Sequence, residues 1–148
     1  GMCELINNKD QLDLLRNDEK LISSTIEEIL RYHPPIQVNN RRNKKDTILE
    51  NKKIPKGTSV HMIIAAANRD PKQFNNPDKF IVSRKPNKHL SFGLGIHICA
   101  GNTLARIEGR VAFLKLIRSF KDFNLQAKPK IANRIRFREI EQLKIEVS

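Results

Sequence analysis

The chain has 148 residues, and its 28 Lys and Arg against 16 Asp and Glu give a formal net charge of +12 at pH 7. This length fits one domain or part of one, and 39% hydrophobic with 30% charged residues argues against wholesale disorder. The short apolar runs exclude a membrane-spanning helix and the two distant cysteines exclude a disulfide framework, so we expect a cytoplasmic protein.

The N-terminal part of the chain is predicted to be helical. A segment over residues 1–18 contains a short helix at 10–16, and apolar residues then recur at helical spacing over 19–33 until two prolines end the pattern. This second helix begins with a cap at Asn17 or Asp18, or in a shorter version with a capping box of Ser24 and Glu27. We favour the longer helix.

The middle of the chain is predicted to form a small, mostly antiparallel sheet over residues 36–68. Within it, residues 48–54 are interpreted as an edge strand, 55–58 as a turn and 59–67 as a buried strand. The following segment, 69–101, is rich in Pro, Asn, Gly and charge without a clear period. Irregular stretches of this length usually carry function, so we treat this meander as a candidate site.

Regular structure is predicted to resume in the C-terminal part. Apolar residues recur at helical spacing over 102–120, and the alternation of Leu143, Ile145 and Val147 indicates a strand in a terminal β region, residues 121–148. The predicted fold class is α+β. The apolar residues of the helix are expected to form one broad face and are Leu104, Ala105, Ile107, Val111, Ala112, Leu114 and Leu116.

The basic charge balance first suggests a nucleic-acid or other acidic partner. Aromatic residues are only 5% of the chain, with one Tyr and no Trp, so a base-stacking platform would be poorly supplied. No zinc-finger, helix-turn-helix or Walker spacing is present either. Nucleic acid is therefore the least favoured partner.

The candidate for chemistry is Cys99, which lies in a glycine-rich loop directly before the 102–120 helix. A sulfur at the N-terminal end of a helix meets its positive dipole and free N–H groups, which favours the thiolate. Gly95 and Gly101 allow tight turns and the close approach of a large flat group. A zinc site would need further Cys or His ligands at short spacing, and only His97 is close enough. A nucleophilic cysteine with His97 as its base is disfavoured, because side chains two residues apart in an extended loop point to opposite sides. An inert buried cysteine is the remaining alternative.

At this point the sequence resembles the cytochrome P450 superfamily, the haem-thiolate monooxygenases. Phe92, Gly95, His97, Cys99 and Gly101 fit the cysteine signature F-x-x-G-x-H-x-C-x-G in the form common in bacterial and archaeal members. The resemblance implies that Cys99 is the proximal ligand of haem iron and that its thiolate pushes electron density toward the iron. It further implies that Phe92 packs near the ligand loop and that His97 binds a haem propionate.

Two further motifs carry the resemblance. Glu28 and Arg31 match the E-x-x-R helix of the family, and the i, i+3 spacing puts both side chains on one helix face. Alone this pair would more often be solvated, but the resemblance implies that it locks onto Arg84 of the meander and has a structural role. Arg41 matches the arginine that binds a haem propionate, with a solvated basic run over 41–45 as the alternative.

The resemblance covers nearly the whole chain but only the C-terminal, haem-ligand part of the family, so residues 1–148 are expected to form a single partial domain. Nothing in the chain matches the family's oxygen-activating A/G-G-x-x-T segment. Uncovering several hundred Å² of apolar surface would forfeit on the order of 10 kcal/mol. We therefore expect self-association, a second chain that covers the missing half, or local refolding that excludes haem.

Two functions follow as hypotheses. The first is a haem-binding part of a monooxygenase that inserts one oxygen atom into an organic substrate, inactive alone and served by an acidic ferredoxin or a flavin protein. Basic residues near the loop would steer that redox partner, with a solvated helix face as the alternative; they are Lys88, Arg106, Arg110 and Lys115. The second is a non-catalytic interaction or scaffold remnant that binds haem weakly or not at all.

Overall fold

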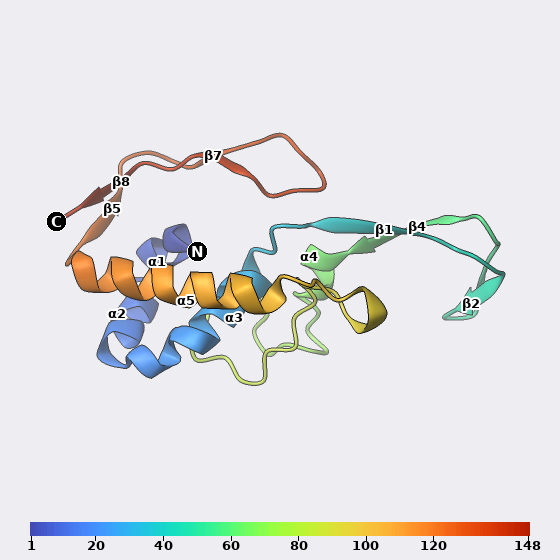
Figure 1. Cartoon of the computed structure of the whole chain (residues 1–148), viewed down its shortest axis with the longest axis horizontal. Helices are drawn as coiled ribbons and strands as arrows, with labels where there is room; N and C mark the ends of the chain where they lie inside the picture. Colours follow the sequence, from blue (N-terminus) through green and yellow to red (C-terminus); the bar gives the residue numbers. More distant parts are fainter.

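The helical body is built from both ends of the chain. A computed structural model describes all 148 residues, and in it four N-terminal helical segments pack beside one long C-terminal helix (Figure 1). The N-terminal segments are α1 (Met2–Asn7), α2 (Lys9–Asn17), the 3-10 turn η1 (Glu19–Leu21) and α3 (Ile22–Tyr32), and the long helix is α5 (Asn102–Ser119). None of the helices is long and apolar enough to cross a membrane.

The helix predicted over 19–33 forms in its longer version. Its first turn is the 3-10 turn η1, and the Asp18 carboxylate accepts a hydrogen bond from the Lys20 N–H at 3.1 Å, as a capping residue does. The capping-box alternative is wrong, because the Ser24 hydroxyl instead donates to the Leu21 carbonyl. His33 ends the helix directly before the two prolines.

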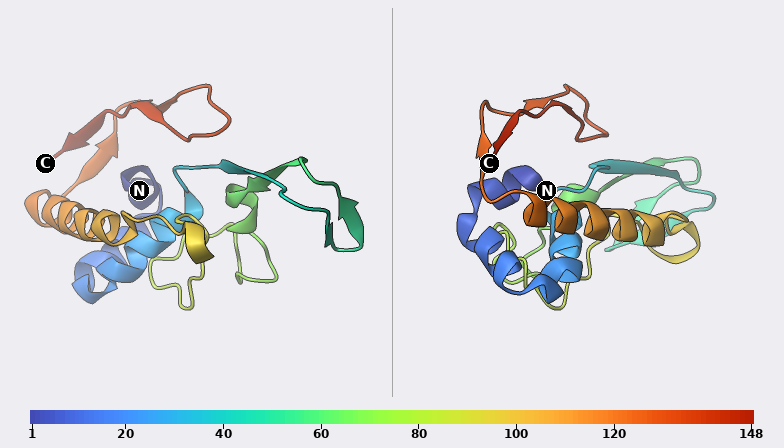
Figure 2. Two further views of the ribbon diagram at one scale, coloured as in Figure 1. Left: turned by 45° about the vertical axis from the view of Figure 1, so that its right-hand side comes forward. Right: turned by 60° about the vertical axis from the view of Figure 1, so that its left-hand side comes forward.

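Four separate two-stranded antiparallel ribbons form two arms that extend from this body (Figures 1 and 2). The first arm joins β1 (Val38–Arg42) to β4 (Ser59–Ile63) and, further out, β2 (Thr47–Leu49) to β3 (Lys52–Ile54). The second arm joins β5 (Phe123–Leu125) to β8 (Ile145–Val147) and β6 (Lys130–Ile131) to β7 (Ile140–Gln142).

The tip of the second arm, the loop between β6 and β7, meets the base of the first arm. Ile36 and Phe137 form an isolated antiparallel bridge, and the Gln37 N–H donates to the Arg136 carbonyl at 2.8 Å. The Arg138 N–H donates to the Pro35 carbonyl at 2.9 Å. The terminal β region is therefore tied to the segment that leads into β1, and the bonded residues Gln37 and Arg136 are 99 positions apart in the sequence.

Two predictions in the first arm are wrong. Residues 48–54 form a hairpin instead of one edge strand, because Glu50 and Asn51 both adopt positive φ angles, 45° and 63°, which is the backbone of a tight two-residue turn. The predicted buried strand over 59–67 splits into β4 and the short helix α4 (Ile64–Ala67). Exposed and half-buried residues alternate along β4, because its ribbon has no second layer packed on it.

The hydrophobic core lies in the helical body, the meander that wraps it and the base of the second arm. Only 19 of the 148 residues are buried. The chain exposes 10376 Å², whereas a compact monomer of its mass exposes about 7,800 Å². The core residues come from α1, α2, α3, the meander, α5 and β5; they are Met2, Leu5, Ile6, Leu12, Leu15, Ile22, Ile26, Phe80, Val82, Ile117 and Phe123.

Helix α5 carries apolar residues on two opposite faces, so the single broad face expected from the sequence is wrong. One face packs against α3, where Gly109 lies so close to Ile26 that a Cβ atom at position 109 would stand 3.2 Å from that side chain. On the other face Leu104 and Val111 are 59% and 61% exposed. This second face is apolar, but no other part of the chain covers it.

Candidate functional site

The cysteine loop, residues 92–101, is a tight loop that places Cys99 at the surface beside the start of α5. The Cys99 N–H donates to the Phe92 carbonyl at 2.8 Å, which closes the loop at its base. Between these two residues the chain turns at Gly95, whose φ of +70° favours glycine, and continues through a 3-10 turn (η2, Gly95–His97). The Cys99 thiol is exposed.

A cavity of about 470 Å³ lies against this loop. Phe92, His97 and Cys99 line one side, and Arg41 of β1 lines it from the first arm. Seven of its thirteen lining residues are hydrophobic, and its size is within the usual range for cofactor and small-molecule sites. The remaining lining residues are Pro35, Ile36, Asn39, Met62, Ile64, Leu90, Ser91, Gly93 and Leu94.

Four of the six residues predicted to contact a cofactor thus share one cavity, although Arg41 is 58 positions from Cys99 in the sequence. Of the other two, Gly95 begins the 3-10 turn within the loop, and Gly101 directly precedes the first turn of α5. A Cβ atom at Gly101 would come within 4.0 Å of the Cys99 sulfur. The Arg41 guanidinium is exposed and donates to the Asn40 carbonyl at 2.8 Å.

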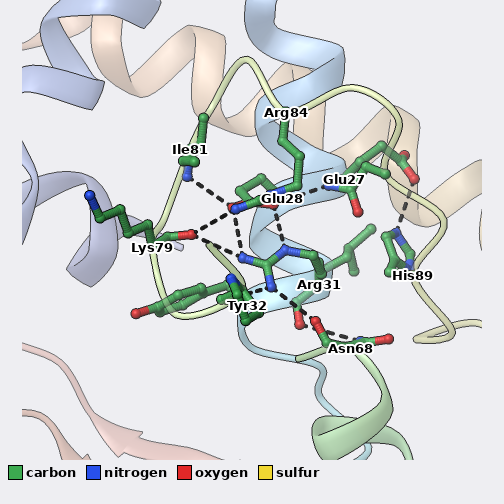
Figure 3. Close-up of polar contacts among 12 residues, drawn as sticks. Glu27, Glu28, Arg31, Tyr32, Asn68, Lys79, Ile81, Arg84 and His89 are labelled. Atoms are coloured by element: carbon green, nitrogen blue, oxygen red, sulfur yellow. Dashed lines mark hydrogen bonds and ion pairs between the residues drawn. The ribbon is translucent and has the colours of Figure 1, made fainter. Parts of the chain in front are cut away.

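Glu28, Arg31 and Arg84 meet in the interior of the helical body (Figure 3). The Glu28 carboxylate lies 2.7 Å from Arg31 Nε and 3.0 Å from Arg84 Nε, and it also accepts the Ile81 N–H at 2.9 Å. The side chains of Glu28 and Arg31 are completely buried. Two guanidiniums share one carboxylate, so the cluster keeps a net positive charge that needs further acceptors.

Backbone carbonyls of the meander supply those acceptors. Arg31 donates to the carbonyls of Asn68, Pro77 and Lys79 at 2.8 to 3.1 Å. Arg84 donates to the carbonyls of Asn75, Asn76 and Lys79 at 2.6 to 3.1 Å. The irregular course of residues 69–87 is therefore held by Arg31 of α3 and by Arg84 of the meander itself, because these carbonyls are not part of a helix or a strand ladder.

A second polar cluster, formed by Glu27, His89 and Arg106, was not foreseen from the sequence. Arg106 donates to Glu27 through Nε at 2.6 Å and Nη2 at 2.9 Å, and His89 Nε2 lies 3.0 Å from the same carboxylate. Because the Ser91 N–H donates to His89 Nδ1, the proton of this imidazole is on Nε2 and is donated to Glu27. Burial raises the pKa of Glu27, but the hydrogen bonds from His89 and Arg106 outweigh it and lower the pKa to about 2.

This second cluster changes the interpretation of the basic surface. Arg106, which the sequence offered as a free charge for steering a partner, is paired with Glu27, while Lys88 and Lys115 are exposed. The usable sequence signal was the adjacency of Glu27 and Glu28, since neighbouring residues on a helix point about 100° apart and must face different elements.

Comparisons with known proteins agree with this architecture. The family model described as Cytochrome P450 matches residues 7–141. Cytochrome P450 CYP107DY1 of Priestia megaterium is 40% identical over 125 residues, which are 84% of this chain and 30% of that protein. Cytochrome P450 119 of Sulfolobus acidocaldarius is 41% identical over 118 residues, which are 80% of this chain and 32% of that protein.

Solved structures match over almost the entire chain. P450BioI, crystallised in complex with an acyl carrier protein that carries hexadec-9Z-enoic acid, gives a TM-score of 0.96 at 37% identity and covers 99% of this chain. PksS of Bacillus subtilis, from its bacillaene polyketide synthase, gives 0.94 at 33% identity. The chain covers 38% of the first structure and 39% of the second. The chain therefore belongs to the cytochrome P450 family, whose members bind haem iron, and it spans about a third of the length of the relatives it matches.

Proposed function

We propose that this chain is the haem-binding C-terminal part of a P450 monooxygenase, with Cys99 as the proximal ligand of the iron. His97 and Arg41 would hold the haem propionates, Phe92 would pack beside the ligand loop, and Gly95 and Gly101 would allow the macrocycle to approach. When bound, the haem supplies the redox chemistry by which the family inserts one oxygen atom into an organic substrate.

The observation that carries this proposal is the composition of the cavity beside Cys99. It offers one soft sulfur donor, apolar walls such as Phe92 and Ile64, and two basic side chains, His97 and Arg41. A haem has the complementary chemistry: an iron that accepts one axial thiolate, an apolar macrocycle and two anionic propionates. The exposed thiol and the open space at Gly95, where a Cβ atom would have no neighbour within 4 Å, are compatible with a large flat group.

The residues of the chain have defined tasks in this function. Cys99 presents the ligand, and the backbone bond from its N–H to Phe92 keeps the sulfur at a fixed place in the cavity wall. The N-terminal end of α5 follows the ligand directly in the chain. Glu28, Arg31 and Arg84 hold the meander that supports the loop and do not line the cavity.

Activity also requires the rest of a P450-type fold, so we propose that this chain works only when completed by a polypeptide that carries it. The large exposed area and the uncovered face of α5 at Leu104 and Val111 support such a partner. Self-association of this chain is the alternative way to cover that face. An acidic ferredoxin or a flavin protein would supply electrons, attracted by the net charge of +12.

The test is haem uptake with its spectrum. The purified chain is mixed with haemin, reduced with dithionite and exposed to carbon monoxide, and the Soret band is recorded. We expect the red-shifted band of thiolate ligation, loss of that band in Cys99→Ala, and its retention in the matched control Cys3→Ala. Equal uptake by the chain and Cys99→Ala would refute the ligand role of Cys99.

A second candidate function is a non-catalytic interaction or scaffold protein derived from a P450. It is favoured by the exposure of the loop, where Leu94 and Ile96 are 78% and 96% exposed. No other part of the chain covers these two side chains. In that case haemin uptake is weak or absent with the completing polypeptide present as well as without it. Restoration of the thiolate band by that polypeptide would instead reject this candidate.

A further inference from the structure

Arg106 contacts three segments that surround the cysteine loop. Its guanidinium pairs with Glu27 of α3 through Nε and Nη2 and lies over the ring of Phe92, with 4.7 Å from Cζ to the ring centroid. The third nitrogen, Nη1, donates to Asn102 Oδ1 at 2.8 Å. One side chain at the first turns of α5 therefore contacts α3, the end of the meander and the start of its own helix.

Two of these contacts lead directly to Cys99. The Phe92 carbonyl accepts the Cys99 N–H at 2.8 Å. The Asn102 side-chain amide, whose oxygen is held by Arg106, donates through Nδ2 to the Cys99 carbonyl at 2.6 Å. The Cys99 carbonyl also accepts the Asn102 backbone N–H at 3.2 Å, so Asn102 holds it twice. Both polar backbone groups of Cys99 are thus bonded to residues that Arg106 contacts, and the guanidinium reinforces both anchors of the peptide that carries the sulfur.

We propose that Arg106 is the positioning residue of Cys99, and that Glu27, held in turn by His89, fixes the guanidinium in place. The purpose of this device, presentation of the sulfur to haem iron, rests on the proposed function, but the device itself belongs to the chain without haem. It is separate from the Glu28, Arg31 and Arg84 cluster, whose donors end on the meander carbonyls and on Glu28.

The geometry requires arginine at this position. Nε and Nη2 serve the two oxygens of Glu27, Nη1 serves Asn102, and the flat face of the same group covers Phe92. A lysine ammonium is a point charge without a planar face, so it could pair with Glu27 but could not also stack and hold Asn102. Arg106→Lys should therefore keep the ion pair to α3 and release the loop.

The experiment compares Arg106→Gln and Arg106→Lys with Arg110→Gln in the chain without haem. Arg110 lies one turn further along α5 and has no hydrogen-bonded partner, so its variant removes an equal charge from the same helix. Two readouts are local to the loop: amide hydrogen exchange at Cys99, and the alkylation rate of Cys99 relative to Cys3 in the same molecule. Core amides such as those of Leu15 and Val82 report overall stability.

We expect Arg106→Gln to raise exchange at the Cys99 amide by about tenfold and to change the Cys99 to Cys3 alkylation ratio, with core amides nearly unchanged. Arg106→Lys should release the loop almost as far without loss of folding, and Arg110→Gln should leave both readouts at their original values. An equal rise in loop and core amides, an effect of Arg110→Gln as large as that of Arg106→Gln, or an unchanged Cys99 amide would overturn the proposal.

These outcomes do not depend on haem uptake. If the chain fails to bind haemin but Arg106→Gln still frees the Cys99 amide, the proposed function fails and the positioning role stands. If haemin binds through Cys99 but the loop is indifferent to Arg106, the positioning role fails and the proposed function stands.

Discussion

The Glu28 cluster consists of charged side chains and the cysteine loop mainly of glycine and apolar residues, and their exposure to solvent is the reverse of what these compositions suggest. Glu28 and Arg31 are fully buried and every charge there has a partner, whereas Ile96 of the loop is 96% exposed. A buried charge destabilises the fold unless it is paired, and a large apolar side chain that stays exposed contributes no free energy of burial. The contrast separates a finished side, whose charges are all paired within this chain, from an unfinished side, whose apolar residues are uncovered in it.

Removal of the Glu28 carboxylate tests the finished side of this comparison and should have the largest effect. Glu28→Gln leaves Arg31 and Arg84 buried beside each other without their anion, so we expect unfolding free energy to fall by about 3–5 kcal/mol. Urea denaturation measures this loss. Glu19→Gln, which breaks the exposed ion pair to Arg118, is the control and should hardly move the transition. Similar losses in both variants would mean that burial of the cluster is not what stabilises it.

Polar substitution on the uncovered face of α5 tests the unfinished side. The double variant Leu104→Gln, Val111→Gln removes apolar area that is exposed in the single chain, so it should weaken association with any covering partner by about 1–2 kcal/mol per site. Light scattering over a concentration series, with and without the completing polypeptide, measures the change. Ile48→Gln is the control, because Ile48 is 73% exposed but belongs to β2, the strand at the far end of the first arm (Figure 1). An equal effect of Ile48→Gln would show unspecific stickiness.

Low pH should weaken the ion pair of Glu27 and Arg106, which links α3 to the cysteine loop, and its effect on stability should be the smallest of the three. The folded-state pKa of Glu27 is lowered from 4.5 to about 2, so its contribution to stability is present above pH 4.5 and is lost as the pH falls toward 2. The stability difference between the chain and Glu27→Gln should therefore shrink over that window. Thermal unfolding followed at several pH values gives this difference, and a gap that stays constant down to pH 2 would contradict the pairing.

Sequence reasoning reached the parts of this molecule that local spacing determines. The i, i+3 relation of Glu28 and Arg31 and the cap at Asp18 are local, and both appear in the structure. The turn at Glu50 and Asn51 was missed because neither residue is a glycine, the usual marker of positive φ. The exposed second face of α5 was missed because periodicity identifies apolar positions but not whether a neighbour covers them.

The site was harder to predict where it depends on distant residues. The cysteine loop could be identified from its own residues, while the ion pair of Glu27 and Arg106 joins positions 79 residues apart and leaves no periodic trace. Arg106 looked like any exposed basic residue of a helix. Its role follows only from the crossing of α3 and α5, which is a property of tertiary packing.

That crossing is set at Gly109, where the absence of a side chain lets α5 rest directly on Ile26. An alanine at this position would require Ile26 or α5 to shift by a few tenths of an ångström, and a larger side chain would act as a spacer between the helices. Because Glu27 follows Ile26 and Arg106 precedes Gly109 by one turn, a spacer there would also pull apart the carboxylate and the guanidinium. The absence of a side chain at Gly109 thus keeps Arg106 within hydrogen-bonding distance of Glu27, and through Arg106 it affects the loop that carries the Cys99 sulfur.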